Sequence, residues 1–385
     1  MLRSFTITRV RDIEIRVHPS FLLVVLWVAF HWGVMDDRGI SALIYGALLV
    51  FFIFCCVVLH ELGHSFMALH FGVKVHDITL LPIGGVARLE HLPSRPTTEA
   101  LIAIAGPLVN VAIAVALVPP LLLLGVFNGY NSLVDYLSYV DDIAPGGLLI
   151  YLFFTNVMLV LFNMLPAFPM DGGRVVRAGL SAVVGRERAT GFAVLLGQAA
   201  AVVLAILGIW WGDYLLPLIG LFIIGAAYAE GRAVRLESAM RRLRVGQFAL
   251  WDMGGISAHH PLTYALRGGP RDVVVTDGSR VIGMLWRHQL LPGLNGAIAG
   301  RTVADVMDRD VETVDIQASV YDVQQKMHEL DRWALPVTED GLYRGIFTAD
   351  RFVHVYRYLN AQSGGSRFAA SWAVAIGNAF RGLIR

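Results

Sequence analysis

Long apolar runs constrain the fold of this chain more than any other feature of its sequence. A helix needs about 20 apolar residues to cross the hydrocarbon core of a bilayer. The chain is 56% hydrophobic and 16% charged, whereas soluble proteins carry roughly 25% charged residues. The sequence therefore predicts a polytopic α-helical membrane protein with about six transmembrane helices. The predicted spans lie near residues 20–35, 42–69, 100–126, 148–164, 190–211 and 214–230, of which the first and last are short.

Basic residues in the short connections fall almost entirely on one side of this predicted bundle. The other side holds Arg38 and the acidic connection 129–147. Cytosolic connections carry an excess of Lys and Arg, so we expect both termini to be cytosolic in a multi-pass protein of the cell membrane. The basic residues on the predicted cytosolic side are Arg3, Arg9, Arg11, Arg16, Lys74, Arg88, Arg95, Arg174, Arg177, Arg186, Arg188, Arg232, Arg235, Arg241, Arg242 and Arg244.

Beyond about residue 240 the composition becomes that of a soluble domain. The segments "RDVVVTDGSRVIGMLW" and "WALPVTEDGLYRGIFT" each predict two strands around a short turn, with helical stretches beside them. This repetition predicts two copies of one α+β unit. We therefore divide the chain into a membrane domain at 1–240, a paired soluble domain at 245–360 and a C-terminal amphipathic helix at 361–385.

The last 20 or so residues place aromatic and apolar side chains four positions apart, with arginines at both ends. One interpretation is a helix that lies in the cytosolic interface of the bilayer. The other is a helix that packs on the soluble domain or on a second subunit. The sequence leaves both open.

The segment "HELGH", which begins at His60, lies inside the second apolar run. Residues i and i+4 of a helix share a face, so His60 and His64 can bind one zinc ion while Glu61 accepts a proton from the attacking water. Ionisable groups within a membrane span are costly and tend to be functional. The alternative is a set of mutually hydrogen-bonded groups at a membrane boundary.

A catalytic zinc ion usually has three protein ligands and one open position. We expect Asp171 to be the third ligand, because the second and fourth spans both lead to the cytosolic side. Cys56 is a rival ligand four residues before His60, but three consecutive ligands on one helical face would extend over about 12 Å. Cys55 and Cys56, the two cysteines of the chain, are interpreted as small buried apolar residues.

Three motifs in this order resemble those of the site-2 protease family of intramembrane zinc metalloproteases. They are "HELGH", "AGPLVN" at 105–110 and "NMLPAFPMDGG" at 163–173. The paired soluble units resemble cystathionine-β-synthase (CBS) domains. The resemblance covers nearly the whole chain and implies a prokaryotic inner-membrane protease with a cytosolic tandem CBS domain.

The resemblance implies roles for the matching residues. His60, His64 and Asp171 would bind zinc, and Glu61 would activate the water. Asn163 is a candidate to stabilise the tetrahedral oxyanion, and the alternative for it is a hydrogen bond at a helix end.

Two further motifs have structural and functional interpretations. Gly106, Pro107 and Asn110 match the motif of the third span, where we expect close helix packing, with Asn110 bonded to backbone. Gly84 and Gly85 in "LLPIGGVARLE" are candidates to let an extended substrate strand approach. The alternative for these two glycines is an ordinary hairpin turn.

Paired CBS domains often bind adenine nucleotides through a G-x-x-T-x-x-D motif, as the resemblance implies. The second copy reads "GIFTADRF", with Thr348 in place and Asp350 one position early. The first copy has Trp286 where the threonine would stand and lacks the aspartate. Nucleotide binding remains open, and so does a dimerisation or substrate-docking module that would give a homodimer.

We therefore expect a zinc endopeptidase that cleaves transmembrane or membrane-associated proteins near the cytosolic side, in regulated intramembrane proteolysis, with the CBS pair as a candidate regulator. The alternative is a non-enzymatic membrane sensor or transporter gated by the CBS pair. A transporter should show broken or charged helices in symmetry-related halves, whereas these features gather at one site here. The net charge of +1 gives no reason to expect nucleic acid as a partner.

Overall fold

The computed structural model describes residues 4–30, 39–82, 84–89, 95–129, 132–138, 144–252, 254–267, 271–291 and 300–362. It divides into two compact units, Met1–Val234 and Arg235–Arg385. The C-terminal helix predicted at 361–385 lies outside the described residues beyond Gln362.

Five helices of the described chain are long and apolar enough to cross a membrane. They correspond to five of the predicted spans. The first predicted span contains α1 (Leu22–Phe30), which has nine residues, and the positions after it lie outside the described residues. The five long helices are α2 (Gly39–His70), α3 (Pro96–Asn128), α5 (Pro145–Asn163), α7 (Arg186–Trp211) and α8 (Leu215–Arg242).

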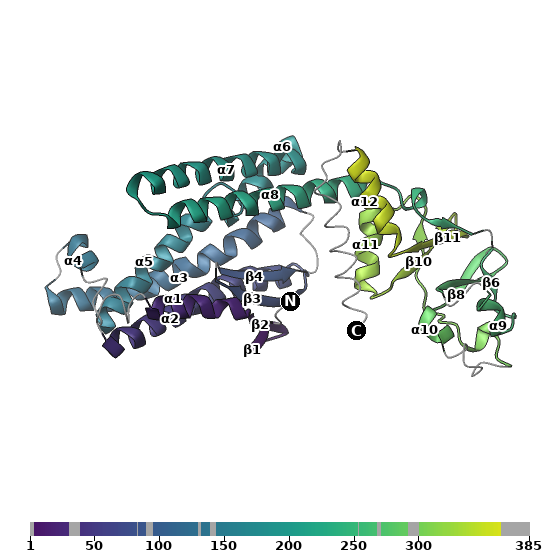
Figure 1. Ribbon diagram of the computed structural model, residues 1–385, viewed down its shortest axis with the longest axis horizontal. Helices are drawn as coiled ribbons and strands as arrows, with labels where there is room; N and C mark the ends of the chain where they lie inside the picture. The colour runs from purple at the N-terminus through teal and green to yellow at the C-terminus, as the bar shows by residue number, and fades with distance from the viewer. Residues whose placement is uncertain are drawn as a thin grey trace. The chain divides into compact units, whose positions relative to one another are not determined.

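Helix α3 is the central element of the first unit. It packs against α2, α5 and the short helix α6 (Asp171–Val184). Small residues allow close contact, because a Cβ added at Gly63 of α2 would lie 2.8 Å from the Ala105 carbonyl oxygen of α3. Helices α7 and α8 form an antiparallel pair on the other side of α3 from a β-sheet (Figure 1). A further short helix, α4 (Leu133–Ser138), precedes α5.

That sheet has the strand order β1-β2-β3-β4, in which β2 and β3 are parallel and the other pairs are antiparallel. One face of it packs on α2 and α3 through Ile13, Ile78, Leu62 and Ile102. Leu62 is the middle residue of "HELGH", so the sheet packs directly against the turn of α2 that carries the motif. The strands are β1 (Phe5–Val10), β2 (Ile13–Val17), β3 (Val75–Leu81) and β4 (Gly84–Leu89), and a short 3-10 turn (Pro19–Phe21) follows β2.

The segment between α5 and α6 turns the chain so that Asp171 begins α6. The buried Phe168 donates its backbone N–H to the Ala193 carbonyl of α7 at 3.1 Å. A Cβ added at Gly197 of α7 would lie 1.9 Å from the Phe168 carbonyl oxygen. Helix α7 therefore packs closely against the segment that leads to Asp171.

The second unit contains two copies of one arrangement of strands. In each copy a short first strand lies parallel to a second strand, which forms an antiparallel hairpin with a third. This repeat confirms the predicted paired α+β unit. The first copy contains β6 (Ile256–Ser257), α9 (Leu262–Ala265), β7 (Val273–Asp277), β8 (Arg280–Leu285) and α10 (Arg287–Leu290). The second contains β9 (Val314–Asp315), α11 (Val320–Glu329), β10 (Ala334–Glu339), β11 (Leu342–Thr348) and α12 (Arg351–Gln362).

Short segments before and between the two copies also pair with strands of the copies. Strand β5 (Leu250–Trp251), which precedes the first copy, pairs with β11 of the second. Asp308, in the connection between the copies, forms an isolated bridge with Met284 of β8. The 3-10 turns Val245–Gln247 and Val303–Asp305 precede these segments. The pair therefore folds as one body.

Candidate active site

The structure brings His60, His64 and Asp171 together, although Asp171 lies more than a hundred residues later in the chain. The Nε2 atoms of the two histidines are 3.1 Å apart, and each lies 3.0–3.2 Å from Asp171 Oδ2. All three side chains are buried. They are the one group in the described chain that could hold a metal ion by the spacing of its ligand atoms.

The spacing of these three atoms fits zinc. Zinc binds imidazole nitrogen and carboxylate oxygen at about 2.0–2.2 Å, so two tetrahedral ligands lie about 3.3–3.6 Å apart. The observed separations of 3.0–3.2 Å are close to that range. His60, His64 and Asp171 would hold a zinc ion through three protein ligands, which leaves one position for substrate or water.

The protonation of the histidines also favours a cation. His64 Nδ1 lies 2.7 Å from the Ile102 carbonyl oxygen, which can only accept, so this nitrogen carries the proton. His60 Nδ1 contacts Asn110 Oδ1 at 2.5 Å in the same way. Both Nε2 atoms therefore direct lone pairs toward a carboxylate oxygen. Three acceptors that face one another in a buried site favour a cation between them.

Gly106 of α3 makes room for the His64 ring. A Cβ at this position would lie 2.2 Å from His64 Nε2. Pro107 cannot donate the helix hydrogen bond to the Ala103 carbonyl. This carbonyl is one residue after Ile102, whose carbonyl accepts from His64. The predicted role of Gly106 in close packing is confirmed. The prediction for Asn110 is wrong, because its amide bonds to side chains and not to backbone.

Strand β4 passes directly beside Glu61. A Cβ at Gly85 would lie 2.5 Å from Glu61 Cγ, so only a glycine fits against this side chain. Gly84 has a φ of +136° and open space around its Cβ position. Gly85 therefore lets a sheet strand contact the "HELGH" motif, and Gly84 supplies a backbone conformation that L-residues rarely adopt.

The Asn163 side chain donates from Nδ2 to the Leu159 carbonyl oxygen of its own helix at 2.9 Å. This is the helix-end hydrogen bond considered as the alternative for this residue. An amide nitrogen has two hydrogens, so one donor remains for another partner. The oxyanion role of Asn163 stays a prediction.

Sequence reasoning gave no role to the ion pairs of Arg177. This side chain of α6 is 1% exposed and bonds Glu99 at the start of α3 and Glu230 of α8, with 2.9 Å to the latter. Its guanidinium also lies over the Phe168 ring at 4.9 Å. Acidic residues at the ends of predicted spans are the signal that could have pointed to these pairs, since Glu99 directly precedes the span 100–126 and Glu230 ends the span 214–230.

Arg174 lies one turn after Asp171 on α6. It is close enough to Glu61 and Asp171 for its charge to act on both carboxylates. The site therefore combines one cationic side chain with the acceptors of the cluster.

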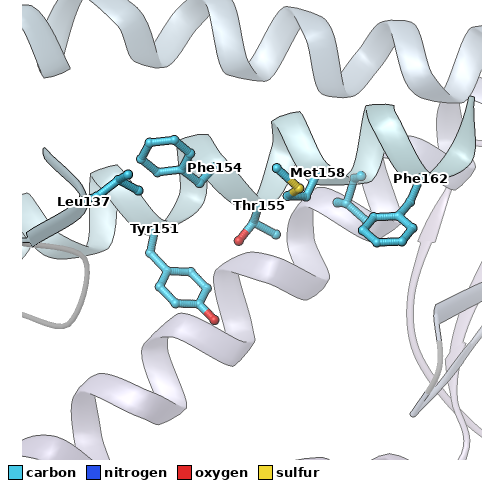
Figure 2. A pocket seen from close by; sticks show the side chains of 7 residues that line it. Leu137, Tyr151, Phe154, Thr155, Met158 and Phe162 are labelled. Carbon is cyan, nitrogen blue, oxygen red and sulfur yellow. The ribbon is translucent and has the colours of Figure 1, made fainter. Parts of the chain in front are cut away.

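An apolar groove of about 530 Å³ runs along α5 (Figure 2). The α5 residues that line the groove recur every three or four positions and form one stripe along the helix. Asn156 does not line the groove, because it lies about 100° farther round the helix than Thr155. No ligand of the cluster lines the groove. The lining residues are Leu137, Tyr151, Phe154, Thr155, Met158, Leu159 and Phe162.

The fold and the cluster define a class of protein, a metalloprotease built into a membrane. The chain belongs to peptidase family M50, whose family model matches residues 48–207. The CBS domain model matches residues 303–358. The zinc metalloprotease MJ0392 of Methanocaldococcus jannaschii is 30% identical over 352 residues, which cover 90% of this chain and 94% of that protein.

Other known proteins are similar over shorter ranges. Stage IV sporulation protein FB of Bacillus subtilis is 27% identical over 43% of this chain and 46% of its own length. The solved structure of a site-2 protease from Methanocaldococcus jannaschii is 36% identical, covers 60% of this chain and 95% of that chain, and has a TM-score of 0.44.

The chain is therefore a multi-pass membrane zinc metalloprotease that carries a C-terminal CBS domain. The family assignment confirms the predicted resemblance and the predicted class of enzyme. It decides against the non-enzymatic sensor or transporter.

Proposed function

We propose that this protein hydrolyses peptide bonds of transmembrane or membrane-associated proteins near the cytosolic side of the membrane. His60, His64 and Asp171 would hold the zinc ion, and Glu61 would act as the general base. The meeting of these three ligand atoms within 3.0–3.2 Å of one another, at one end of α2, carries this proposal.

The chemistry assigned to this chain is proton transfer and substrate positioning. Bound zinc supplies a Lewis acid that polarises the scissile carbonyl and lowers the pKa of water toward about 7. Glu61 accepts the proton of the attacking water and passes it to the leaving amine. Asn163 has a second amide hydrogen with which to stabilise the oxyanion.

Strand β4 is the proposed binding place for an unwound substrate. It is the last strand in the sheet order and pairs with β3 on one side. An extended peptide can add to such an edge through main-chain hydrogen bonds. Gly85 contacts Glu61 at this edge, so an added strand would expose its carbonyl groups to the general base.

The cytosolic orientation of this end rests on the charge of the connections. Arginines gather on the side where α2 and α5 end, and the positive-inside rule makes that side cytosolic. The same rule places the CBS pair in the cytosol, because α8 ends in Arg241 and Arg242.

In this proposal, the CBS pair regulates the zinc site through α8, which connects the two units along the chain. Helix α8 continues without a break from the first unit across the boundary at residue 235. Its Glu230 bonds Arg177 of α6, and Asp171 is the first residue of α6. A displacement of α8 that strains this ion pair would act on the helix that carries a zinc ligand.

An adenine nucleotide would bind the second CBS copy and not the first. Thr348 ends β11 and Asp350 stands just before α12, where a phosphate or ribose can reach them. A titration of the full-length protein with ATP, ADP and AMP tests this assignment, with Thr348→Val as the variant that should lose binding. Absence of a signal at millimolar nucleotide would remove it.

The function itself is tested by reconstitution of the purified protein with a model membrane substrate. We expect the wild type to contain one zinc ion and to cleave the substrate, and Glu61→Gln to keep zinc without cleavage. Equal cleavage by both proteins would contradict the role of Glu61. A wild type without zinc would contradict the metal site.

A further inference from the structure

We propose that Asn156 of α5 positions the zinc ligand His60 through a relay of two buried amides. Asn110 of α3 is the intermediate amide. This inference rests on the proposed zinc site and adds to it a residue outside the cluster.

Three consecutive hydrogen bonds make up the relay. His60 Nδ1 contacts Asn110 Oδ1 at 2.5 Å, and Asn110 Nδ2 donates to Asn156 Oδ1 at 2.7 Å. Asn156 Nδ2 donates to the Leu152 carbonyl oxygen at 2.8 Å and to Cys56 Sγ at 3.3 Å. Both asparagine side chains are 0% exposed, so the relay is closed to solvent.

The orientation of every amide follows from the last partner in the series. The Leu152 carbonyl oxygen can only accept, so Asn156 must present its nitrogen there and its oxygen to Asn110. Asn110 must then present its nitrogen to Asn156 and its oxygen to His60. His60 therefore carries its proton on Nδ1 and offers the Nε2 lone pair to the metal. A backbone carbonyl of α5 thus sets the tautomer of a ligand on α2.

The second histidine provides an internal comparison. His64 Nδ1 reaches the Ile102 carbonyl oxygen directly at 2.7 Å, so backbone fixes its tautomer without an intermediate. An amide can rotate by 180° and exchange its donor and acceptor, whereas a carbonyl cannot. His60 therefore needs Asn156 to fix Asn110, and His64 needs no such partner. Partners of this kind hold a ligand in its metal-binding form and orientation.

The test measures zinc affinity of the full-length protein by competition with a chelator. We expect Asn156→Leu to weaken zinc binding by about 10–100-fold, because Asn110 can then turn its nitrogen toward His60. Thr190→Val is the matched control. Thr190 is also buried, but its hydroxyl bonds Arg186 within α7 and leads to no ligand, so this variant should bind zinc as the wild type does.

A second substitution that restores zinc affinity distinguishes a positioning role of Asn156 from a role in packing alone. In Asn110→Asp both oxygens of the side chain accept, so it can bond His60 Nδ1 in either orientation. We expect Asn110→Asp combined with Asn156→Leu to recover most of the affinity that Asn156→Leu loses. An Asn156→Leu protein with wild-type affinity, or a double variant no better than Asn156→Leu, would overturn the relay.

The measurement of zinc affinity does not depend on the cleavage activity of the protein. A wild type that binds no zinc would contradict the proposed function. A wild type that binds zinc, with Asn156→Leu unchanged, would contradict the relay alone. The visible spectrum of the cobalt-substituted proteins gives a second readout, and we expect Asn156→Leu to alter it and Thr190→Val to leave it unchanged.

Discussion

Two polar clusters of this protein, one in each unit, differ in their balance of hydrogen-bond donors and acceptors. In the first unit, His60, His64 and Asp171 bring three acceptor atoms within 3.0–3.2 Å of one another. In the second unit, Asp308 Oδ2 accepts from Trp286 Nε1 at 2.9 Å and from Arg332 Nη2 at 3.0 Å. The first cluster has no donor at its centre, whereas the second pairs donors with an acceptor.

This difference in donors and acceptors explains why the first cluster favours a bound cation and the Asp308 cluster does not. Three buried acceptors favour a bound cation, whereas the acceptor of the Asp308 cluster is satisfied by donors of the chain itself. The Arg332 guanidinium also lies over the Trp286 ring at 4.6 Å. Trp286 stands where the first copy of the nucleotide motif would have its threonine, and it donates a hydrogen bond to Asp308. The Asp308 cluster is therefore self-contained.

The largest effect should come from Gly106→Ala. The added Cβ would lie 2.2 Å from His64 Nε2 and would push this ligand out of the cluster. We expect zinc content and cleavage to fall by at least about 100-fold, as measured by metal analysis and by the reconstituted assay. Gly225→Ala in α8 is the control, because nothing lies within 4 Å of its Cβ position. Full zinc occupancy in Gly106→Ala would contradict the geometry of the cluster.

A third polar cluster contains two acceptor groups, Glu99 and Glu230, and one donor group, Arg177. Arg177→Met would leave Glu99 without its buried partner. We expect a loss of about 3–5 kcal/mol in the free energy of unfolding, measured by thermal unfolding in detergent. Glu230→Gln should cost at most about 1 kcal/mol, because the Glu230 side chain is 27% exposed. Equal losses in both variants would refute the ranking.

Gly85→Ala tests the contact between β4 and Glu61 without touching a zinc ligand. A Cβ 2.5 Å from Glu61 Cγ forces the strand or the carboxylate to move. We expect zinc to be retained and kcat to fall by about 10–100-fold. Activity equal to that of the wild type would mean that β4 and Glu61 do not act together.

The smallest effect concerns the self-contained cluster of the second unit. The hydrogen bond from Trp286 holds the pKa of Asp308 below its usual value, with help from the Asp310 backbone N–H and Arg332. A lowered pKa in the folded state stabilises the protein above the unfolded pKa of about 4, and this stabilisation is lost as the pH falls through the folded value.

We therefore expect Asp308→Asn to cost about 1 kcal/mol at pH 7, and the difference from the wild type to shrink below about pH 4. Thermal unfolding of the full-length proteins between pH 7 and pH 3 measures both. A difference that stays constant over this range would rule out the ionised form of Asp308 as the cause.

The parts of the site that helical geometry determines could be predicted from the sequence. The spacing of His60 and His64 on one helix places both on one face, and the direction of two spans brings Asp171 to the same end. Asn156 could not be found in this way, because it lies in no motif and its partner Leu152 acts through backbone. Its role depends on the packing of α2, α3 and α5, which no local pattern specifies.

The fold of the soluble unit followed from its repeated strand pairs, but its ligand chemistry did not. A departure from the motif at Trp286 could be read from the sequence alone. The partners Asp308 and Arg332 lie in other segments, and only the fold brings them to the Trp286 ring. Side-chain pairs between distant segments are therefore the main part that sequence reasoning missed.

X-ray absorption at the zinc edge of the purified protein tests the central claim most directly. We expect nitrogen and oxygen neighbours at about 2.0–2.2 Å, with imidazole scattering from two histidines and no sulfur. Cys56 contacts Asn156 in the structure and stands outside the ligand cluster. A sulfur neighbour at about 2.3 Å would make Cys56 a ligand and would contradict the site built from His60, His64 and Asp171.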